Sequence, residues 1–384
     1  MLKLIFSYHL SKYGKFRNAF TLTETLAGAI IGLILLGAML SWLVNFMYQD
    51  KNEEILAKTQ QNMDRAMEYM REDISGALYV YDFQQTPYNT CSSSPSACTS
   101  NVGNNYSNGN VLPYPLVGIP ASLIAANYIP ILAFWKLASL SNLNASICSG
   151  LSNSTYIPED NPTITNGAFS YQGECNALLY RRKMMTLVVY FLKTNVGDSS
   201  DNGWYGPARI LRYEFDKYLQ PMTTYGRNTG FIDPTYSGNY SSWPENNSQK
   251  NLQASLPTIS ATNPAVLVDY VDDPKSTADS NFSTCDSTQS RTPAYPIAPA
   301  NMAPGTYNGN YPTTYYSTSF WACVTTLSSQ GSGNAWSSPA GIAQKVSIYL
   351  RGNAKGSDGL NKLNRVLPPI YTTISVRGVV GENY

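Results

Sequence analysis

The chain has few side chains that could carry acid–base, nucleophilic or metal chemistry. Its 384 residues include a single histidine, His9. A Ser-His-Asp triad, a Cys-His pair or a histidine-ligated zinc site needs histidine in the folded part of a protein. The sequence also lacks a Walker A loop, a GxGxxG motif and a CxxC pair. We therefore expect no catalytic residue, no metal and no cofactor, and we predict that the protein is not an enzyme.

Carboxylates leave two alternatives open. Asp and Glu alone can hydrolyse glycosides, so a carboxylate-based glycosidase is possible in principle, although no sequence spacing supports it. The acidic runs at residues 198–202 and 269–273 contain oxygen ligands that calcium accepts. Neither run matches the EF-hand pattern, and solvated turn residues are the usual alternative. We assign no metal to them.

Six cysteines lie beyond residue 90, in Ser-, Asn- and Pro-rich sequence: Cys91, Cys98, Cys148, Cys175, Cys285 and Cys323. An even number outside the apolar segment suggests disulfides formed in an oxidising compartment. Six free thiols are the alternative. Six cysteines allow 15 pairings, and our working hypothesis pairs nearest neighbours: 91 with 98, 148 with 175, and 285 with 323.

The first structural element that the sequence predicts is a long apolar segment. Residues 1–19 carry four basic side chains and no acid, and residues 20–49 carry one charge, Glu24. As a helix, the uncharged part from residue 25 would be roughly 37 Å long, enough to span a bilayer. The basic flank should stay in the cytoplasm, which places the rest of the chain outside.

A secretory signal peptide and an uncleaved signal anchor are two ordinary explanations for this apolar segment, and neither accounts for all of its features. A secretory signal peptide has a shorter apolar core and a small-residue cleavage site, which is missing here. An uncleaved signal anchor fits the hydropathy equally well. However, it gives no reason for Glu24, whose unpaired burial would cost about 2–3 kcal/mol.

The sequence Phe20-Thr21-Leu22-Thr23-Glu24, followed by the apolar helix, resembles the processing site of type IV pilins and pseudopilins. The resemblance implies that a prepilin peptidase cleaves between Ala19 and Phe20 and that Phe20 becomes N-methylated. It also implies that Glu24 pairs with the new amine of an adjacent subunit during assembly. The family usually has Gly before the cut, where this chain has Ala19.

The same resemblance implies partners for the helix. The residues expected to pack against the helices of other pilins or pseudopilins are Leu22, Leu26, Gly28, Ile31 and Gly32. Gly28 and Gly32 also form a GxxxG pattern, which either makes a close dimer or simply allows bundled helices to approach. A prepilin peptidase and the pilus assembly platform of the inner membrane are the other implied partners.

The helical pattern continues beyond the apolar segment. Apolar or small residues recur every three or four positions, which predicts one buried face: Ile55, Thr59, Met63, Ala66, Met67, Met70 and Ile74. Gly76 is the first expected break, although Leu78 and Tyr81 extend the stripe, so we place the amphipathic half of the helix at residues 50–82. From Phe20 to Gly76 such a helix would have about 57 residues and a length of roughly 85 Å.

Residues 83–384 are predicted to form a β-rich domain outside the cytoplasm. Short apolar or alternating runs predict strands at residues 130–135, 184–192, 209–215, 265–271, 346–351 and 371–377. We expect the second and third strands to pair, and also the last two. No βαβ rhythm is present, so the sheet should be antiparallel. The fold class is α+β: a long helix packed on an antiparallel sheet, with long loops at residues 84–127, 141–177, 219–262 and 274–340.

These strands and the Thr-Thr-Ile-Ser-Val-Arg-Gly ending resemble the larger pseudopilins, most closely the hormogonium polysaccharide secretion pseudopilins. That resemblance implies a subunit of a type IV pilus-like assembly that supports polysaccharide secretion or gliding motility. The subunit would sit in the inner membrane by one helix and enter an extracellular fibre on assembly. A type II secretion-like minor pseudopilin, or an adhesin that binds surface glycan, are alternatives.

Charge argues against nucleic acid as a partner. Only 13% of the residues are charged, and the net charge of the whole chain is +1. Loss of residues 1–19 would leave 22 Lys and Arg against 25 Asp and Glu, a net charge of about −3. Such a chain has no electrostatic attraction for a polyanion.

Overall fold

The computed structural model describes residues 21–83, 114–124, 128–153, 170–195, 203–219, 225–234, 240–245, 251–253, 255–257, 264–273, 285, 289–292, 319–325, 344–356 and 365–376. The chain divides into two compact units, Met1–Glu54 and Ile55–Tyr384. Helix α2 (Leu22–Ser75) begins in the first unit and ends in the second.

Helix α2 has 54 residues and ends directly before Gly76. Its buried residues are those of the predicted stripe, apart from the partly buried Ile55: Thr59, Met63, Ala66, Met67, Met70 and Ile74. Leu78 and Tyr81 do not extend the helix, because residues 77–81 form strand β1 (Ala77–Tyr81). The run Ala-Leu-Tyr-Val-Tyr is rich in strand-forming residues, and Gly76 interrupts the helix before it.

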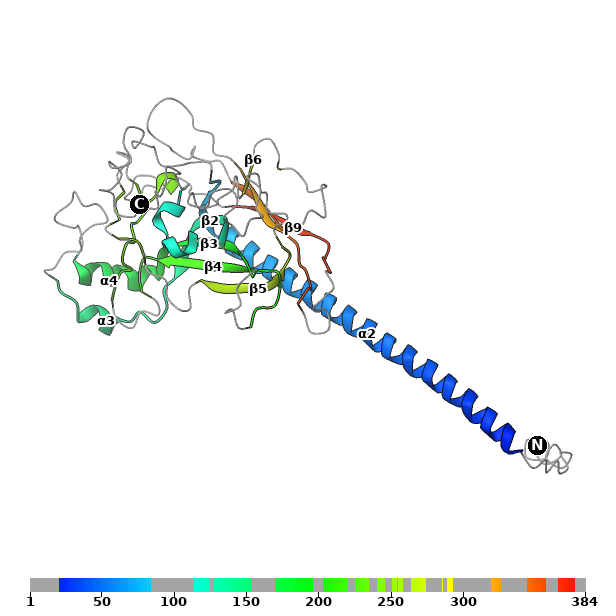
Figure 1. The fold of residues 1–384 in the computed structure, drawn as a ribbon. Helices are drawn as coiled ribbons and strands as arrows, with labels where there is room; N and C mark the ends of the chain where they lie inside the picture. The colour runs from blue at the N-terminus through cyan, green and yellow to red at the C-terminus, as the bar shows by residue number, and fades with distance from the viewer. Residues whose placement is uncertain are drawn as a thin grey trace, which may run out of the picture. The chain divides into compact units, whose positions relative to one another are not determined.

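The first sheet contains five antiparallel strands in sequence order (Figure 1). They are β1, β2 (Tyr128–Ser139), β3 (Lys183–Thr194), β4 (Ala208–Asp216) and β5 (Ala265–Val271). The predicted pairing of the strands at residues 184–192 and 209–215 is confirmed. These strands are β3 and β4, which pair from Thr186 opposite Asp216 to Thr194 opposite Ala208. Both β2 and β3 are longer than the apolar runs that predicted them.

The second sheet contains β6 (Gln289–Thr292), β7 (Phe320–Thr325), β8 (Lys345–Leu350) and β9 (Ile370–Ser375), in that order and all antiparallel. The predicted late pair is confirmed as β8 and β9. Strands β6 and β7 lie in the interval 274–340, which we expected to be a loop. They are only 4 and 6 residues long, so each is supported by pairing with a distant strand rather than by a long local pattern.

Two α-helices also lie where the sequence predicted a loop, within residues 141–177 or extending just beyond them: α3 (Ala145–Ser149) and α4 (Tyr171–Arg181). Asn144 caps α3 by accepting a hydrogen bond from the Ile147 amide, and Ser170 caps α4 by accepting one from Gly173. Short 3₁₀ turns fall in two other expected loops: η3 (Leu116–Gly118), η4 (Ala121–Ile124) and η5 (Tyr240–Ser242).

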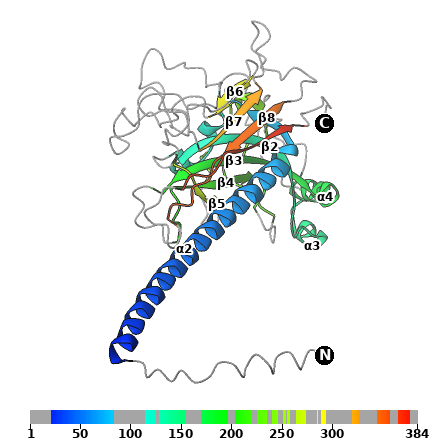
Figure 2. The ribbon, with the colours of Figure 1, turned by 90° about the vertical axis from the view of Figure 1, so that its right-hand side faces the viewer.

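The first sheet is buried on both faces. Val188, Tyr190 and Leu192 of β3 belong to a core that also includes the buried stripe of α2 and apolar residues of the second sheet. The intervening Val189 and Phe191 belong to a second core on the opposite face, with aromatic residues such as Trp243. Burial on both sides explains why β3 is a continuous apolar run instead of an alternating one. Figure 2 shows the C-terminal turns of α2 alongside these strands.

A buried glutamine connects the two sheets. The Gln344 side chain accepts a hydrogen bond from the Val80 amide (2.8 Å) and donates one to the Val80 carbonyl (2.7 Å). Gln344 is 3% exposed, and it directly precedes β8. Its amide group therefore satisfies the backbone N–H and C=O of Val80 in the edge strand β1, which would otherwise be buried without these partners.

Two of the hypothesised disulfides are confirmed. Cys148 of α3 is bonded to Cys175 of α4, with a Cα–Cα distance of 5.4 Å. Cys285 is bonded to Cys323 of β7, with a Cα–Cα distance of 5.6 Å. Cys91 and Cys98 lie outside the described residues.

Candidate assembly helix and polar anchor

The start of α2 places Glu24 at the N-terminal end of the helix. The Thr21 carbonyl accepts hydrogen bonds from the amides of Glu24 (3.0 Å) and Thr25 (3.2 Å), which closes the first turn. Glu24 lies in that turn and is exposed. A carboxylate is favoured there because the unsatisfied amides of a helix N-terminus carry partial positive charge. Ala19 and Phe20 lie outside the described residues.

The N-terminal half of α2 exposes a continuous apolar surface. Its most apolar 18-residue window has a mean hydropathy of 2.3, and none of that window is buried. Leu22, Leu26 and Ile31 are 84%, 61% and 58% exposed. A side-chain carbon added at Gly28 or Gly32 would meet no atom within 4 Å. An exposed apolar surface of this size is typical of a site that contacts a membrane or another protein.

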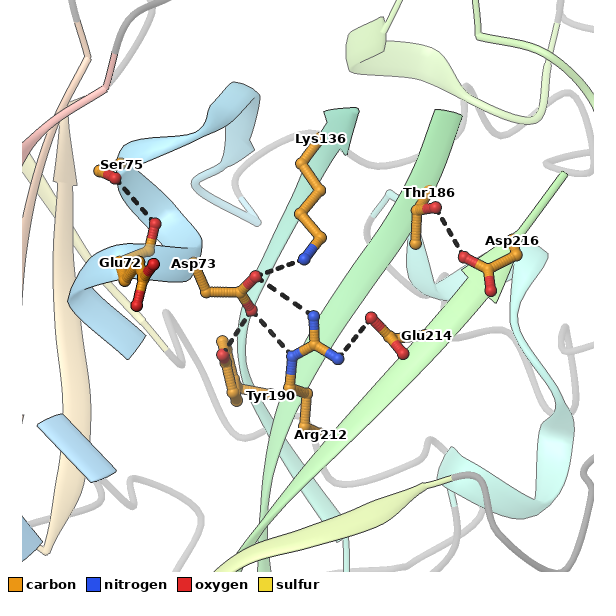
Figure 3. A network of polar contacts seen from close by, with 9 residues as sticks. All are labelled: Glu72, Asp73, Ser75, Lys136, Thr186, Tyr190, Arg212, Glu214 and Asp216. Atoms are coloured by element: carbon orange, nitrogen blue, oxygen red, sulfur yellow. Dashed lines mark hydrogen bonds and ion pairs between the residues drawn. The ribbon is translucent and has the colours of Figure 1, made fainter. Parts of the chain in front are cut away.

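The C-terminal end of α2 carries a group of polar contacts that we call the polar anchor: Asp73 of α2, Lys136 of β2, Tyr190 of β3 and Arg212 of β4 (Figure 3). The Asp73 carboxylate accepts hydrogen bonds from Lys136 Nζ (2.5 Å), Tyr190 Oη (2.6 Å), Arg212 Nε (2.8 Å) and Arg212 Nη2 (3.2 Å). Three neighbouring strands therefore each supply one donor residue to a single carboxylate of the helix, and Arg212 donates twice.

Electrostatics keep the polar anchor ionised. Burial disfavours the charged form of Asp73, but the hydrogen bonds and charges of Arg212 and Lys136 outweigh it and lower the pKa of Asp73. Burial also opposes the charged form of Arg212, yet Asp73 raises the pKa of Arg212 above its usual value. The pKa of Tyr190 is raised, chiefly by burial and then by the Asp73 charge. A carboxylate held this way is a weak base, so it serves to fix the helix on the sheet.

A second buried carboxylate has the same role in α4. Glu174 accepts hydrogen bonds from Tyr218 Oη (2.5 Å), Arg227 Nη2 (3.0 Å) and the Tyr225 hydroxyl. Burial alone would raise the pKa of Glu174, but the charges of Arg227 and Lys217 and the two tyrosine hydrogen bonds lower it. Glu174 thus ties α4 to the chain that follows β4. The lowered pKa keeps Glu174 ionised, as its cationic and hydroxyl partners require.

The candidate calcium ligands have other partners where they are described. Asp269 accepts hydrogen bonds from the Tyr205 amide (3.1 Å) and the Gly206 amide (3.4 Å). Asp272 pairs with Arg351 at 2.7 Å, and both side chains are 1% exposed. Residues 198–202 lie outside the described residues. Within the described part of the chain, no group of three or more His, Cys, Asp or Glu side chains could hold a metal.

Sequence reasoning missed the polar anchor, although a signal for it was present. Asp73 lies three residues after Met70 and directly before Ile74, at the border of the buried stripe. Arg212 lies two residues after Ile210, so both face the same side of β4. A charged residue that occupies a core-facing position in each element indicates a buried ion pair.

Among the described residues the fold is α+β, with two antiparallel sheets and one N-terminal helix that is long and apolar enough to cross a membrane. No protein family, no curated protein and no solved structure matches the chain.

Proposed function

We propose that the protein is a non-enzymatic pseudopilin or minor pilin, a subunit of a type IV pilus-like assembly that supports polysaccharide secretion or gliding motility. The observation that carries the proposal is Glu24, an exposed carboxylate in the first turn of an unburied apolar helix. The preceding Phe-Thr-Leu-Thr motif and the basic residues 1–19 support it. The helix would hold the subunit in the inner membrane, with the β-rich part outside the cytoplasm.

The chemistry of assembly follows from the cost of burying charge. Cleavage after Ala19 creates a positively charged amine on Phe20, and both that amine and Glu24 enter an apolar environment. An unpaired carboxylate costs about 2–3 kcal/mol there, and a well-oriented ion pair with the amine of a neighbouring subunit offsets part of that cost. The pair also fixes the axial position of one helix against the next. Leu22, Leu26 and Ile31 then bury the surface that is exposed in the single chain.

The polar anchor allows α2 to transmit an axial force to the first sheet. An axial pull on α2 would act on Asp73, which is held by donors from β2, β3 and β4. Charge-assisted hydrogen bonds are stronger than neutral ones and directional. The anchor thus couples the last turns of the helix to the first sheet while subunits are drawn from the membrane into a fibre.

Two related functions stay as alternatives. A minor pseudopilin of a type II secretion-like system would use the same helix and the same Glu24 contact. An adhesin that binds surface glycan would need the membrane helix only as an anchor, and it would tolerate loss of Glu24. The Glu24 carboxylate therefore separates assembly from simple anchoring.

The test replaces Glu24 by Gln, which keeps size and polarity but removes the charge. We expect normal amounts of protein in the membrane fraction and a loss of most polymer from the sheared extracellular fraction. Glu54→Gln, an exposed position further along α2, is the matched control and should assemble normally. Wild-type polymer yield from Glu24→Gln would refute the assembly function.

A further inference from the structure

The apolar part of α2 ends in a cluster of aromatic side chains that we call the aromatic belt: Trp42, Phe46 and Tyr48. They are 70%, 56% and 46% exposed. Trp42 and Phe46 lie about one turn apart on the same side of the helix, and their stacked rings have centroids 5.9 Å apart at an interplanar angle of 27°. Residues 25–49 contain no other aromatic residue, so the belt marks one end of the apolar segment.

The preceding part of the apolar segment has a different composition. Within residues 25–49, every glycine and alanine lies between residues 27 and 38. A side-chain carbon added at Gly28, Gly32 or Gly37 would meet no atom within 4 Å. Membrane helices use small residues where they approach one another closely. Large aromatic side chains prevent such an approach, so the belt fits lipid better than it fits a neighbouring helix.

The chemistry of the belt favours one region of a bilayer. Trp42 and Tyr48 each combine a flat apolar ring with one polar group, an indole N–H or a phenol hydroxyl. Such side chains are enriched where acyl chains meet headgroups, because the ring contacts hydrocarbon while the polar group reaches water. Charged residues follow at once, at positions 50, 51, 53 and 54. Because charge is costly in hydrocarbon, the membrane-spanning part ends at the belt.

We propose that the aromatic belt contacts the headgroup region on the non-cytoplasmic side of the membrane, and that it thereby places Glu24 at the opposite boundary of the hydrocarbon. The uncharged segment, roughly 37 Å long, exceeds a hydrocarbon core of about 30 Å, so hydropathy alone leaves the depth of the helix open. The core corresponds to about 20 helical residues. Counting back from residue 45, in the middle of the belt, gives residue 25.

This depth refines how Glu24 would act in assembly. A charge at the boundary costs much less than one at the bilayer centre, because its side chain reaches headgroups and water. Glu24 would therefore meet an apolar environment only when its helix leaves the bilayer and packs against other helices. The orientation of the helix and this last step rest on the proposed function. The depth of the single chain is measured without assembly.

The test measures the depth of Trp42 with lipid quenchers. The full chain is reconstituted, at a low ratio of protein to lipid, into phosphatidylcholine vesicles whose acyl chains carry bromine either close to the headgroup or near their ends. The chain has six tryptophans, and only Trp42 lies within residues 20–49. Subtracting the emission of Trp42→Phe therefore isolates its signal. We expect bromine close to the headgroup to quench Trp42 more strongly than bromine near the chain ends.

Two variants in the Trp42→Phe background supply a matched depth scale. Leu35→Trp places the probe midway between residues 25 and 45, and bromine near the chain ends should quench it most. Leu26→Trp places the probe beside the expected inner boundary, and bromine close to the headgroup should quench it most. Leu26 and Leu35 are 61% and 60% exposed, so an added ring meets no protein core.

Three results would overturn the proposal. Stronger quenching of Trp42 by bromine near the chain ends would place the belt inside the hydrocarbon. Equal depths of Leu26→Trp and Leu35→Trp would remove Glu24 from the boundary. A Trp42 signal that neither lipid quenches would place the belt outside the bilayer. Polymer yield from Glu24→Gln tests the assembly function in a separate measurement, so either proposal can fail while the other stands.

Discussion

Asp73 of α2 and Arg212 of β4 are joined by two hydrogen bonds, from Arg212 Nε to Oδ2 at 2.8 Å and from Nη2 to Oδ1 at 3.2 Å. The residues are 139 positions apart in sequence. Their side chains are only 6% and 9% exposed. A bidentate guanidinium–carboxylate pair fixes orientation as well as distance. This pair therefore sets the angle at which the last turns of α2 meet the first sheet.

Asp73→Asn should destabilise the protein strongly. The substitution removes the charge that Arg212 and Lys136 face, and leaves Arg212 with Glu214, 2.5 Å away and 39% exposed. Breaking one side of a buried ion pair costs about 3–5 kcal/mol, and the remaining Glu214 contact should bring the loss near about 3 kcal/mol. Urea unfolding at neutral pH measures it.

The neighbouring Glu72→Gln is the control for that measurement. Glu72 is exposed, so its substitution should change the free energy of unfolding by less than about 0.5 kcal/mol. If both variants unfold at the same urea concentration as wild type, the polar anchor contributes nothing to holding the helix.

Asp216→Asn should raise stability at neutral and basic pH. Burial raises the pKa of Asp216 to about 6, partly offset by the hydrogen bond from Thr186 Oγ1 at 2.6 Å. Because the folded pKa is above the unfolded value of 3.8, the contribution of this group to stability is full at low pH. That contribution is lost as the pH rises through about 6. Asparagine keeps the Thr186 contact without the charge.

The measurement is the free energy of unfolding against pH. Wild type and Asp216→Asn should differ by about 1–2 kcal/mol at pH of about 8, and the difference should vanish near pH of about 4. Asp73 and Glu174, whose pKa values are lowered, act in the opposite direction and destabilise the fold only below pH of about 4. A constant difference across this range would show that Asp216 does not titrate as described.

Replacing both Cys148 and Cys175 by Ser should weaken the α3–α4 region. The disulfide closes a loop with a sequence separation of 27, for which the chain-entropy estimate is about 3 kcal/mol. Hydrogen exchange should show lost amide protection in α3 and α4, while β3 stays protected as an internal control. Equal protection in the oxidised wild type and the double variant would contradict the prediction.

The proposed cleavage between Ala19 and Phe20 predicts the N-terminus of the mature protein. Mass spectrometry of the membrane fraction should identify N-methylated Phe20 as the first residue of the mature protein. Ala19→Gly, which introduces the residue that type IV pilins usually have before the cut, should be processed at least as completely. An intact Met1 on the assembled protein would exclude the hypothesis that residues 1–24 contain a prepilin cleavage site.

The sequence alone determined the elements whose signals are local. Helix α2 follows from an uncharged segment and a stripe of period 3.6, although the expected extension to residue 82 was wrong because residues 77–81 form β1. Strands β3, β4 and β5 follow from apolar runs that are long enough to predict a strand without knowledge of the neighbouring strand. Two disulfides were found because their cysteines are neighbours along the chain. Each of these features depends on residues that lie close together in sequence.

Only the tertiary structure decided the features that join distant segments. Strand β7 has six residues in a polar interval, and it forms because β6 and β8 supply its hydrogen bonds. The polar anchor joins Asp73 to Arg212, and the pairing of β7, β8 and β9 brings Trp321, Tyr349 and Tyr371 into register. The energy of these contacts comes from burial and pairing between separate strands. A sequence pattern shows which residues could form such long-range contacts. Which of them become partners is decided only when the sheets pack.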